Sequence, residues 1–216
     1  MKRMERRLSR RHLLCAGIAM TVVAQAPIAR FTTARADGQQ PVDIVKAFYA
    51  VLLDCMKQGP QLGFDGRYQK IEPAVHEAFD VSTMCKIAIG PSWTPMPAEK
   101  KNAVLLTFDT YMVTTYASRF KQFNGQQFIV GDAKQASADR VLVESKLIKS
   151  DGEPIQLNYL FRQTQGVWKI IDIYLSGTIS EMARMRSDFS DTLQSGGADA
   201  LIASLDAKIK ELQAGA

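Results

Sequence analysis

Three consecutive stretches of alternating apolar and polar residues constrain the fold of this chain more than any other feature. They cover residues 141–149, 155–162 and 167–175, and the short segments SDGEP and QTQG join them. Alternation with a period of two is typical of β-strands, and connections this short join antiparallel neighbours. With a short additional strand at residues 128–130, the pattern predicts an antiparallel sheet of four strands.

Helical periodicity precedes and follows the predicted sheet. Pro41 marks a helix start, Pro73 is expected to break a second helical region, and Asp80 is a candidate N-cap for a third, which Gly90 ends. The predicted helical segments are residues 41–58, 64–79, 80–89, 97–123, 179–193 and 198–212, the last two joined by a hinge at residues 195–197. This order predicts one α+β domain in which helices pack over the twisted sheet.

The first 36 residues have the pattern of a signal peptide. Six basic residues within the first eleven positions precede an apolar run, and the run leads to Ala34-Arg35-Ala36, an A-x-A cleavage pattern. The segment SRRHLL is compatible with twin-arginine export and also with a general Sec leader. We therefore expect export to the periplasm, cleavage near Ala36, and a single domain at residues 37–216.

Removal of the leader changes the charge of the chain. Eight of its 27 basic side chains and one of its 22 acidic side chains precede residue 37, so the remainder has a small net negative charge. The high isoelectric point therefore belongs to the leader, and the composition gives no support to a nucleic-acid-binding function.

Cys55 and Cys85 remain after the leader, and their chemistry is open. An oxidising compartment permits a disulfide between them. Alternatively, each is a small buried apolar residue on its own helix. Their spacing does not indicate a metal site.

Catalytic and metal-binding motifs are absent from residues 37–216. His76 is the single histidine and lies in a polar context beside Glu77, and the chain has neither a G-x-S-x-G motif nor a glycine-rich phosphate loop. The sequence therefore predicts no enzyme, no cofactor and no metal.

One predicted strand is apolar on both faces. Ile171, Ile173 and Leu175 alternate with Trp168, Ile170 and Tyr174, and methionines are frequent elsewhere in the chain. Such a strand requires other parts of the protein, or a ligand, to pack on each of its two faces. Methionine adapts to irregular apolar partners, which suits a pocket for flexible chains as well as an ordinary core.

Several segments resemble the MlaC family of periplasmic lipid carriers, also called the toluene-tolerance auxiliary family. FDVSTMCKIAIGPSW, PAEKKNAVLLTFDTYMVTTYASRF, GEPIQLNYLF, VWKIIDIYLSGTIS, RSDF and GGADALIASLDAKI follow one another in the family's order. MKQGPQLGFDGRYQKIEPAVHEAFD and TISEMARMRSDF are most similar to the hopanoid-associated HpnM branch. The resemblance implies a cystatin-like α+β fold with a lipid cavity between sheet and helices.

The resemblance also implies a function. It implies a monomeric periplasmic shuttle for a phospholipid or a hopanoid, working with an inner-membrane transporter and an outer-membrane lipoprotein. The residues expected to face the lipid are Phe48, Leu52, Met84, Ile87, Trp93, Leu105, Phe108, Met112, Tyr116, Leu157, Tyr159, Ile171, Ile173, Ile179, Met182, Arg186 and Phe189.

Arg186 interrupts an apolar stripe on the predicted helix at residues 179–193 and has two interpretations. Its guanidinium could lie near the pocket mouth and bind a lipid phosphate or hydroxyl. It could instead pair with an acid such as Asp172 or Asp188, or extend its charged end into water.

Two other functions remain open at this point. The last predicted strand resembles that of cone-shaped folds that include isomerases and cyclases, with Tyr159 and Asp172 as candidate catalytic residues. The third possibility is a structural subunit of a transport complex that binds no lipid.

Overall fold

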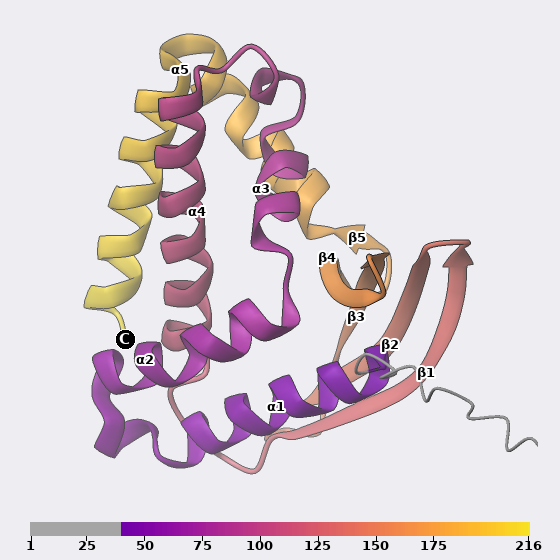
Figure 1. Cartoon of the computed structure of the whole chain (residues 1–216). Coiled ribbons are helices and arrows are strands. Elements are labelled where there is room, and N and C mark those ends of the chain that lie inside the picture. Colours follow the sequence, from indigo (N-terminus) through magenta and orange to yellow (C-terminus); the bar gives the residue numbers. More distant parts are fainter. Residues whose placement is uncertain (1–39) are drawn as a thin grey trace, which may run out of the picture. The chain divides into compact units, whose positions relative to one another are not determined.

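An antiparallel meander of five strands forms the surface on which the helices pack (Figure 1). The computed structural model describes residues 40–216, and the predicted leader lies outside the described residues. The strands are β1 (Gln127–Ser137), β2 (Arg140–Ile148), β3 (Pro154–Thr164), β4 (Val167–Leu175) and β5 (Ile179–Ser180), and they lie side by side in that order.

The prediction of four strands is corrected at both edges of the sheet. β1 has eleven residues and continues beyond residues 128–130, because its exposed second half pairs with β2 through the backbone. β5 has two residues and pairs with the end of β4. A strand this short has no detectable period, and the sequence pattern places its residues in the helix predicted at 179–193.

A β-bulge in β4 also corrects the predicted sides of that strand. Leu160 pairs with Asp172, whereas the next residue of β3, Phe161, pairs with Ile170, so Ile171 has no partner across the ladder. The extra residue reverses the alternation. Ile170 therefore joins the core on the same side as Ile173, and Ile171 lies on the opposite face.

Five α-helices and one 3-10 turn complete the described fold of residues 40–216. They are α1 (Pro41–Lys57), α2 (Gly59–Ala78), α3 (Val81–Ile89), η1 (Gly90–Trp93), α4 (Ala98–Arg119) and α5 (Glu181–Ala214). α5 bends at Gly197, where φ is 63°, which confirms the predicted hinge. The predicted break near Pro73 is wrong: α2 continues through this exposed proline and bends at Gly63 instead.

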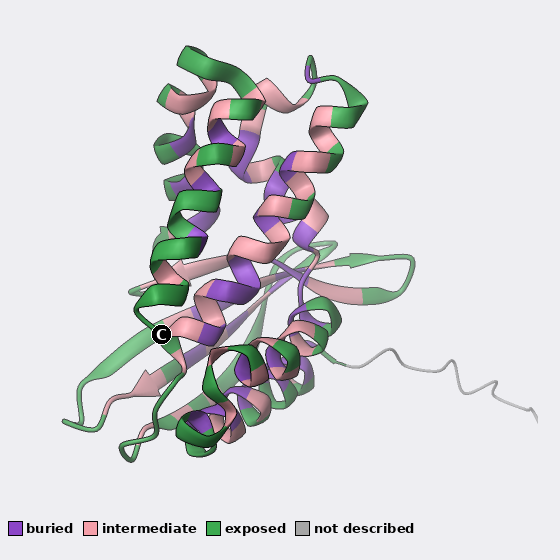
Figure 2. Ribbon diagram, turned by 90° about the vertical axis from the view of Figure 1, so that its left-hand side faces the viewer, coloured by how far each residue is buried: buried purple, intermediate pink, exposed green. Residues whose placement is uncertain are grey.

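The helices form two groups over the sheet. α1 contacts β1 and β2, whereas α5 contacts both α3 and α4. In Figure 1 the last part of α5, coloured yellow, runs beside α4, and a hydrogen bond of 3.1 Å from Ser118 Oγ to the Leu212 carbonyl connects them. Figure 2 shows buried residues on the helix sides that face inward and exposed residues on the outer sides.

Asp80 is the N-cap of α3, as predicted. Its carboxylate accepts a hydrogen bond of 2.9 Å from the Thr83 backbone N–H and one of 2.6 Å from the Thr83 hydroxyl. It also lies 3.3 Å from Arg162 Nη2 on β3. A single carboxylate thus starts the helix and fixes it to the sheet.

Arg67 is a buried cation that the sequence did not reveal. Only 4% of its surface is exposed, and its Nε and Nη1 donate hydrogen bonds of 2.8 Å and 3.1 Å to the carbonyls of Ala117 and Gly59. Burial lowers the pKa of this guanidinium. Its positive charge lies against the Ala117 carbonyl in the last turn of α4, where the helix dipole favours a cation.

Both cysteines are buried free thiols. Cys55 and Cys85 each have 0% exposure. Burial raises the pKa of the Cys85 thiol from 9.0 to about 12. The thiolate is the nucleophile in thiol chemistry. Cys85 is therefore protected from reaction because it is buried and because it stays protonated.

We predict that neither thiol of the native protein reacts with iodoacetamide at pH 8, and that both react after unfolding in denaturant without a reductant. Mass spectrometry of the intact protein measures the labelling. The raised pKa of the Cys85 thiol stabilises the fold fully at pH values below its ordinary pKa of 9.0, and this contribution is lost as the pH rises toward the folded-state pKa. Denatured protein that stays unlabelled until a reductant is added would instead demonstrate a disulfide.

Candidate functional site: an apolar cavity between the helices and the sheet

A cavity of about 110 Å³ lies between the sheet and the group of α3, α4 and the start of α5. Its wall is formed by Met84, Tyr111, Met112, Thr115, Tyr116, Arg119, Phe120, Leu157, Tyr159, Ile173, Leu175, Glu181, Met182 and Met185. The side chains from β3 and β4 therefore form one wall, and the three helices form the others.

Flexible sulfur-containing and aromatic side chains dominate the wall. Four methionines contribute from three different helices, and all four are buried. Methionine has three rotatable bonds and a polarisable sulfur, so it can repack around guests of different shape. The wall is therefore apolar and adaptable.

The aromatic part of the wall continues into the core beneath α1. Tyr116 packs edge-on against Phe48 with ring centroids 5.1 Å apart, and Phe48 packs the same way against Phe79. Burial raises the pKa of the Tyr116 and Tyr159 phenols. Both phenols are therefore neutral at physiological pH, and this end of the cavity carries no charge.

The volume of the cavity limits what fits in this conformation. Pockets for drug-sized ligands measure about 300–1,000 Å³, and a cavity of roughly 150 Å³ accommodates benzene. A long hydrocarbon chain therefore requires the helices to move away from β3 and β4. The methionine side chains on the helices are the groups that would have to repack.

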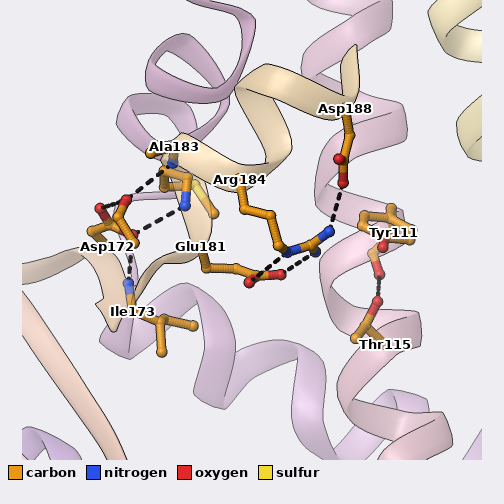
Figure 3. Close-up of polar contacts among 10 residues, drawn as sticks. Tyr111, Thr115, Asp172, Ile173, Glu181, Ala183, Arg184 and Asp188 are labelled. Atoms are coloured by element: carbon orange, nitrogen blue, oxygen red, sulfur yellow. Dashed lines mark hydrogen bonds and ion pairs between the residues drawn. The ribbon is translucent and has the colours of Figure 1, made fainter. Parts of the chain in front are cut away.

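An ion-pair network forms the polar edge beside the cavity (Figure 3). Arg184 donates from Nε and Nη2 to both carboxylate oxygens of Glu181, at 3.0 Å and 2.5 Å, and from Nη1 to Asp188 at 2.5 Å. Hydrogen bonding to Glu181 raises the pKa of Arg184. Glu181 is only 8% exposed, so this bidentate pair neutralises a carboxylate at the cavity wall.

Asp172 fixes the start of α5. Its carboxylate accepts hydrogen bonds from the backbone N–H groups of Ile173 at 2.7 Å and Met182 at 3.1 Å, and from the Ser180 hydroxyl at 2.5 Å (Figure 3). It lines a hollow on the other side of the sheet from Tyr159. The geometry therefore does not assemble the Tyr159 and Asp172 pair that an enzyme would need.

Seven of the expected lipid-facing residues meet at this cavity. They are Met84, Met112, Tyr116, Leu157, Tyr159, Ile173 and Met182. Because they come from α3, α4, α5, β3 and β4, their convergence is a property of the tertiary structure.

The other expected residues lie elsewhere. Phe48, Leu52, Phe108 and Phe189 are buried in the core, and Ile87 and Ile171 line the hollow on the far side of the sheet. Leu105 lines a shallow hollow between α3 and α4, Trp93 lies between Lys86 and Lys101, and Ile179 is 53% exposed in β5.

Arg186 lies outside the cavity wall, on the exposed side of α5. Its aliphatic stem covers Gly90, where φ is 61° and an added Cβ would lie 2.7 Å from Arg186 Cδ. The acid considered as its partner on the same helix, Asp188, is paired with Arg184 instead. Arg186 thus packs its stem against the turn that ends α3 and leaves its charged end near water.

Seven members of the wall are not among the residues predicted from the sequence to face the lipid. They are Tyr111, Thr115, Arg119, Phe120, Leu175, Glu181 and Met185. The helical interval that runs from Met112 through Tyr116 to Arg119 was available as a signal, since residues four apart share one face. A polar residue on an apolar stripe gives no indication of whether it reaches a cavity.

Comparison with known proteins identifies the family. The model of the MlaC family, described as MlaC protein, matches residues 46–207. The chain belongs to the MlaC family. A solved structure of a phospholipid-binding protein from Ralstonia solanacearum in complex with a phospholipid has a TM-score of 0.69 and 23% sequence identity to this chain, covering 81% of this chain and 98% of that one. No curated protein matches the chain.

Two absences apply to residues 40–216, the part that the structure describes. Here no three histidine, cysteine or acidic side chains gather in a way that could bind a metal ion. Nor do the helices in this part include one with the length and apolar character that a membrane crossing requires.

We predict that Arg184→Ala destabilises the protein by about 1–2 kcal/mol, because it leaves the buried Glu181 carboxylate without its two donors. Asp188→Ala removes an exposed i,i+4 partner and is expected to cost less than about 0.5 kcal/mol. Urea unfolding of the two variants measures the difference. Equal losses of unfolding free energy in the two variants would show that Arg184 does not stabilise the buried Glu181 carboxylate.

Proposed function

We propose that this protein binds a membrane lipid and carries it through the periplasm, with the hydrocarbon in the apolar cavity between β3, β4 and the helices. The observation that carries the proposal is the convergence of four methionines and three tyrosines on one cavity in a member of the MlaC family. The Ralstonia protein, which has the same fold, is described in complex with a phospholipid.

Burial of hydrocarbon supplies enough free energy for such a function. Each buried methylene contributes about 0.8 kcal/mol, so a chain of about sixteen carbons gains roughly 12 kcal/mol before the costs of ordering the lipid and opening the helices. No covalent bond or metal ion is needed. Lipid exchange at a membrane is then a matter of transferring the chain between two apolar environments.

The route of opening follows from the way the helices are attached. The first part of α5 is fixed at its start by Asp172, and its far end bends at Gly197. Side chains of α3, α4 and α5 form the helical walls of the cavity, so separation of α4 and α5 from the sheet enlarges it. A glycine with φ of 63° can absorb a change of angle there without side-chain strain.

The proposed cellular role uses the features outside the cavity. The leader pattern at residues 1–36 supports export, and a lipid must cross the aqueous periplasm between two membranes in a protected form. We propose an inner-membrane transporter and an outer-membrane lipoprotein as partners, as the family resemblance implies. The cargo on this proposal is a phospholipid or, as in the HpnM branch, a hopanoid.

Extraction of the exported protein tests the lipid-binding function. Protein purified from the periplasm in the absence of detergent should release about one lipid per chain into chloroform and methanol, and mass spectrometry counts and identifies the lipid. Protein that folds normally but yields no lipid, and takes up none from vesicles, would contradict the proposal.

We predict that Ile173→Glu lowers the bound lipid at least about fivefold, because it places a carboxylate where the hydrocarbon would lie. The matched control is Val167→Glu on the same strand, since Val167 is 52% exposed and lies outside the cavity wall. Circular dichroism verifies that both variants fold. An equal fall of the bound lipid in both variants would show that the lipid does not lie in this cavity.

A further inference from the structure

Arg119 is a cation in an otherwise apolar stripe of α4. It follows Met112 and Tyr116 at helical intervals, and all three line the cavity. Among the residues of the wall, Arg119 alone is exposed, whereas the methionines are buried. The stripe thus runs from the buried interior of the cavity to a positive charge in contact with water, which defines Arg119 as part of the cavity mouth.

The charge of Arg119 has no counter-ion among the described residues. Neither a hydrogen bond nor an ion pair engages its guanidinium anywhere in residues 40–216. The neighbouring cations differ: Arg184 is neutralised by Glu181 and Asp188, and Lys121 donates to the Gly215 carbonyl at 2.5 Å. One guanidinium at the mouth therefore retains all its donors for a ligand.

The electrostatic influence of Arg119 reaches the cavity wall. Burial is the main cause that raises the pKa of the Tyr116 phenol, a second tyrosine adds to it, and the charge of Arg119 acts in the opposite direction. The guanidinium is thus close enough to act on a group inside the cavity, and it would act on a phosphate at the mouth in the same way.

A structural role alone would not require arginine at this position. Arg119 lies in the last turn of α4, where any cation interacts favourably with the helix dipole. Lysine would serve that role equally. Arginine differs by its planar fork of donors, which matches two oxygens of one phosphate.

We propose that Arg119 binds the phosphate of a lipid headgroup at the cavity mouth while the hydrocarbon lies among the methionines, an inference that rests on the proposed lipid-binding function. The site matches such a ligand, because its charged mouth suits the phosphate and its apolar interior suits the hydrocarbon. The proposal selects a phospholipid over a phosphate-free hopanoid as cargo.

The test compares two soluble lipids that share their acyl chains and differ in the phosphate group. Delipidated protein is titrated with dihexanoyl phosphatidylglycerol and with dihexanoylglycerol, and calorimetry measures each affinity. Arg119→Gln is expected to lower the affinity for dihexanoyl phosphatidylglycerol roughly tenfold, because a charge-assisted pair of hydrogen bonds is lost. It should change the affinity for dihexanoylglycerol by less than about twofold. Arg119→Lys should give an intermediate loss.

The matched control is Arg140→Gln, which removes the same charge from an exposed arginine at the start of β2, outside the cavity wall. It should leave both affinities unchanged. An effect of Arg140→Gln equal to that of Arg119→Gln would indicate long-range attraction by net charge and would overturn the assignment.

Three further outcomes would overturn the proposal. Unchanged phosphatidylglycerol binding by Arg119→Gln, or an equal loss for both lipids, removes the headgroup contact but leaves lipid binding intact. Displacement of phosphatidylglycerol by inorganic phosphate would assign Arg119 to free phosphate instead. Failure of the unmodified protein to bind either lipid would refute the proposed function itself, and the headgroup assignment with it.

Discussion

The β-bulge at Ile171 is the constraint on which the arrangement of core and cavity depends. Without it, strict alternation would place Ile171 beside Ile173 and send Ile170 to the opposite face. With it, Ile170 packs into the core, where it meets the segment before α3, and Ile173 and Leu175 form the floor of the cavity. Asp172, the residue that follows the bulge, accepts a hydrogen bond from the Met182 backbone N–H, so the start of α5 is attached beside the bulge.

Four arginines of this chain illustrate how environment decides the role of one residue type. Arg67 is buried and donates to helix carbonyls, Arg184 neutralises a buried carboxylate, and Arg186 covers a glycine with its stem. Arg119 differs from these three because it lines the cavity; like the charged end of Arg186, its guanidinium has no hydrogen-bond or ion-pair partner in the described residues. Charge alone does not distinguish the four, whereas their burial, their acceptors and their position relative to the cavity do.

The cavity combines a small volume with a deformable wall. A volume of about 110 Å³ is far below that of a lipid chain, yet its methionines belong to helices that bend at glycine or end at exposed turns. The same side chains can repack at low cost, because methionine is unbranched. On the proposed function, the residues that pack the interior without lipid are therefore the ones that would repack around it.

The sequence by itself determined the family, through motifs spread along the chain. It also determined the order of the helices and of four of the five strands, the Asp80 cap and the hinge in α5. These features are local, because they follow from periodicity and from residues within one turn of each other. The sequence did not determine that Ile171 faces away from the cavity, that Arg186 covers Gly90, or that Arg119 reaches the mouth. Those outcomes depend on a register shift between β3 and β4 and on the angles between helices. Only the tertiary structure decides them, because contacts between distant segments carry no periodic signal along the chain.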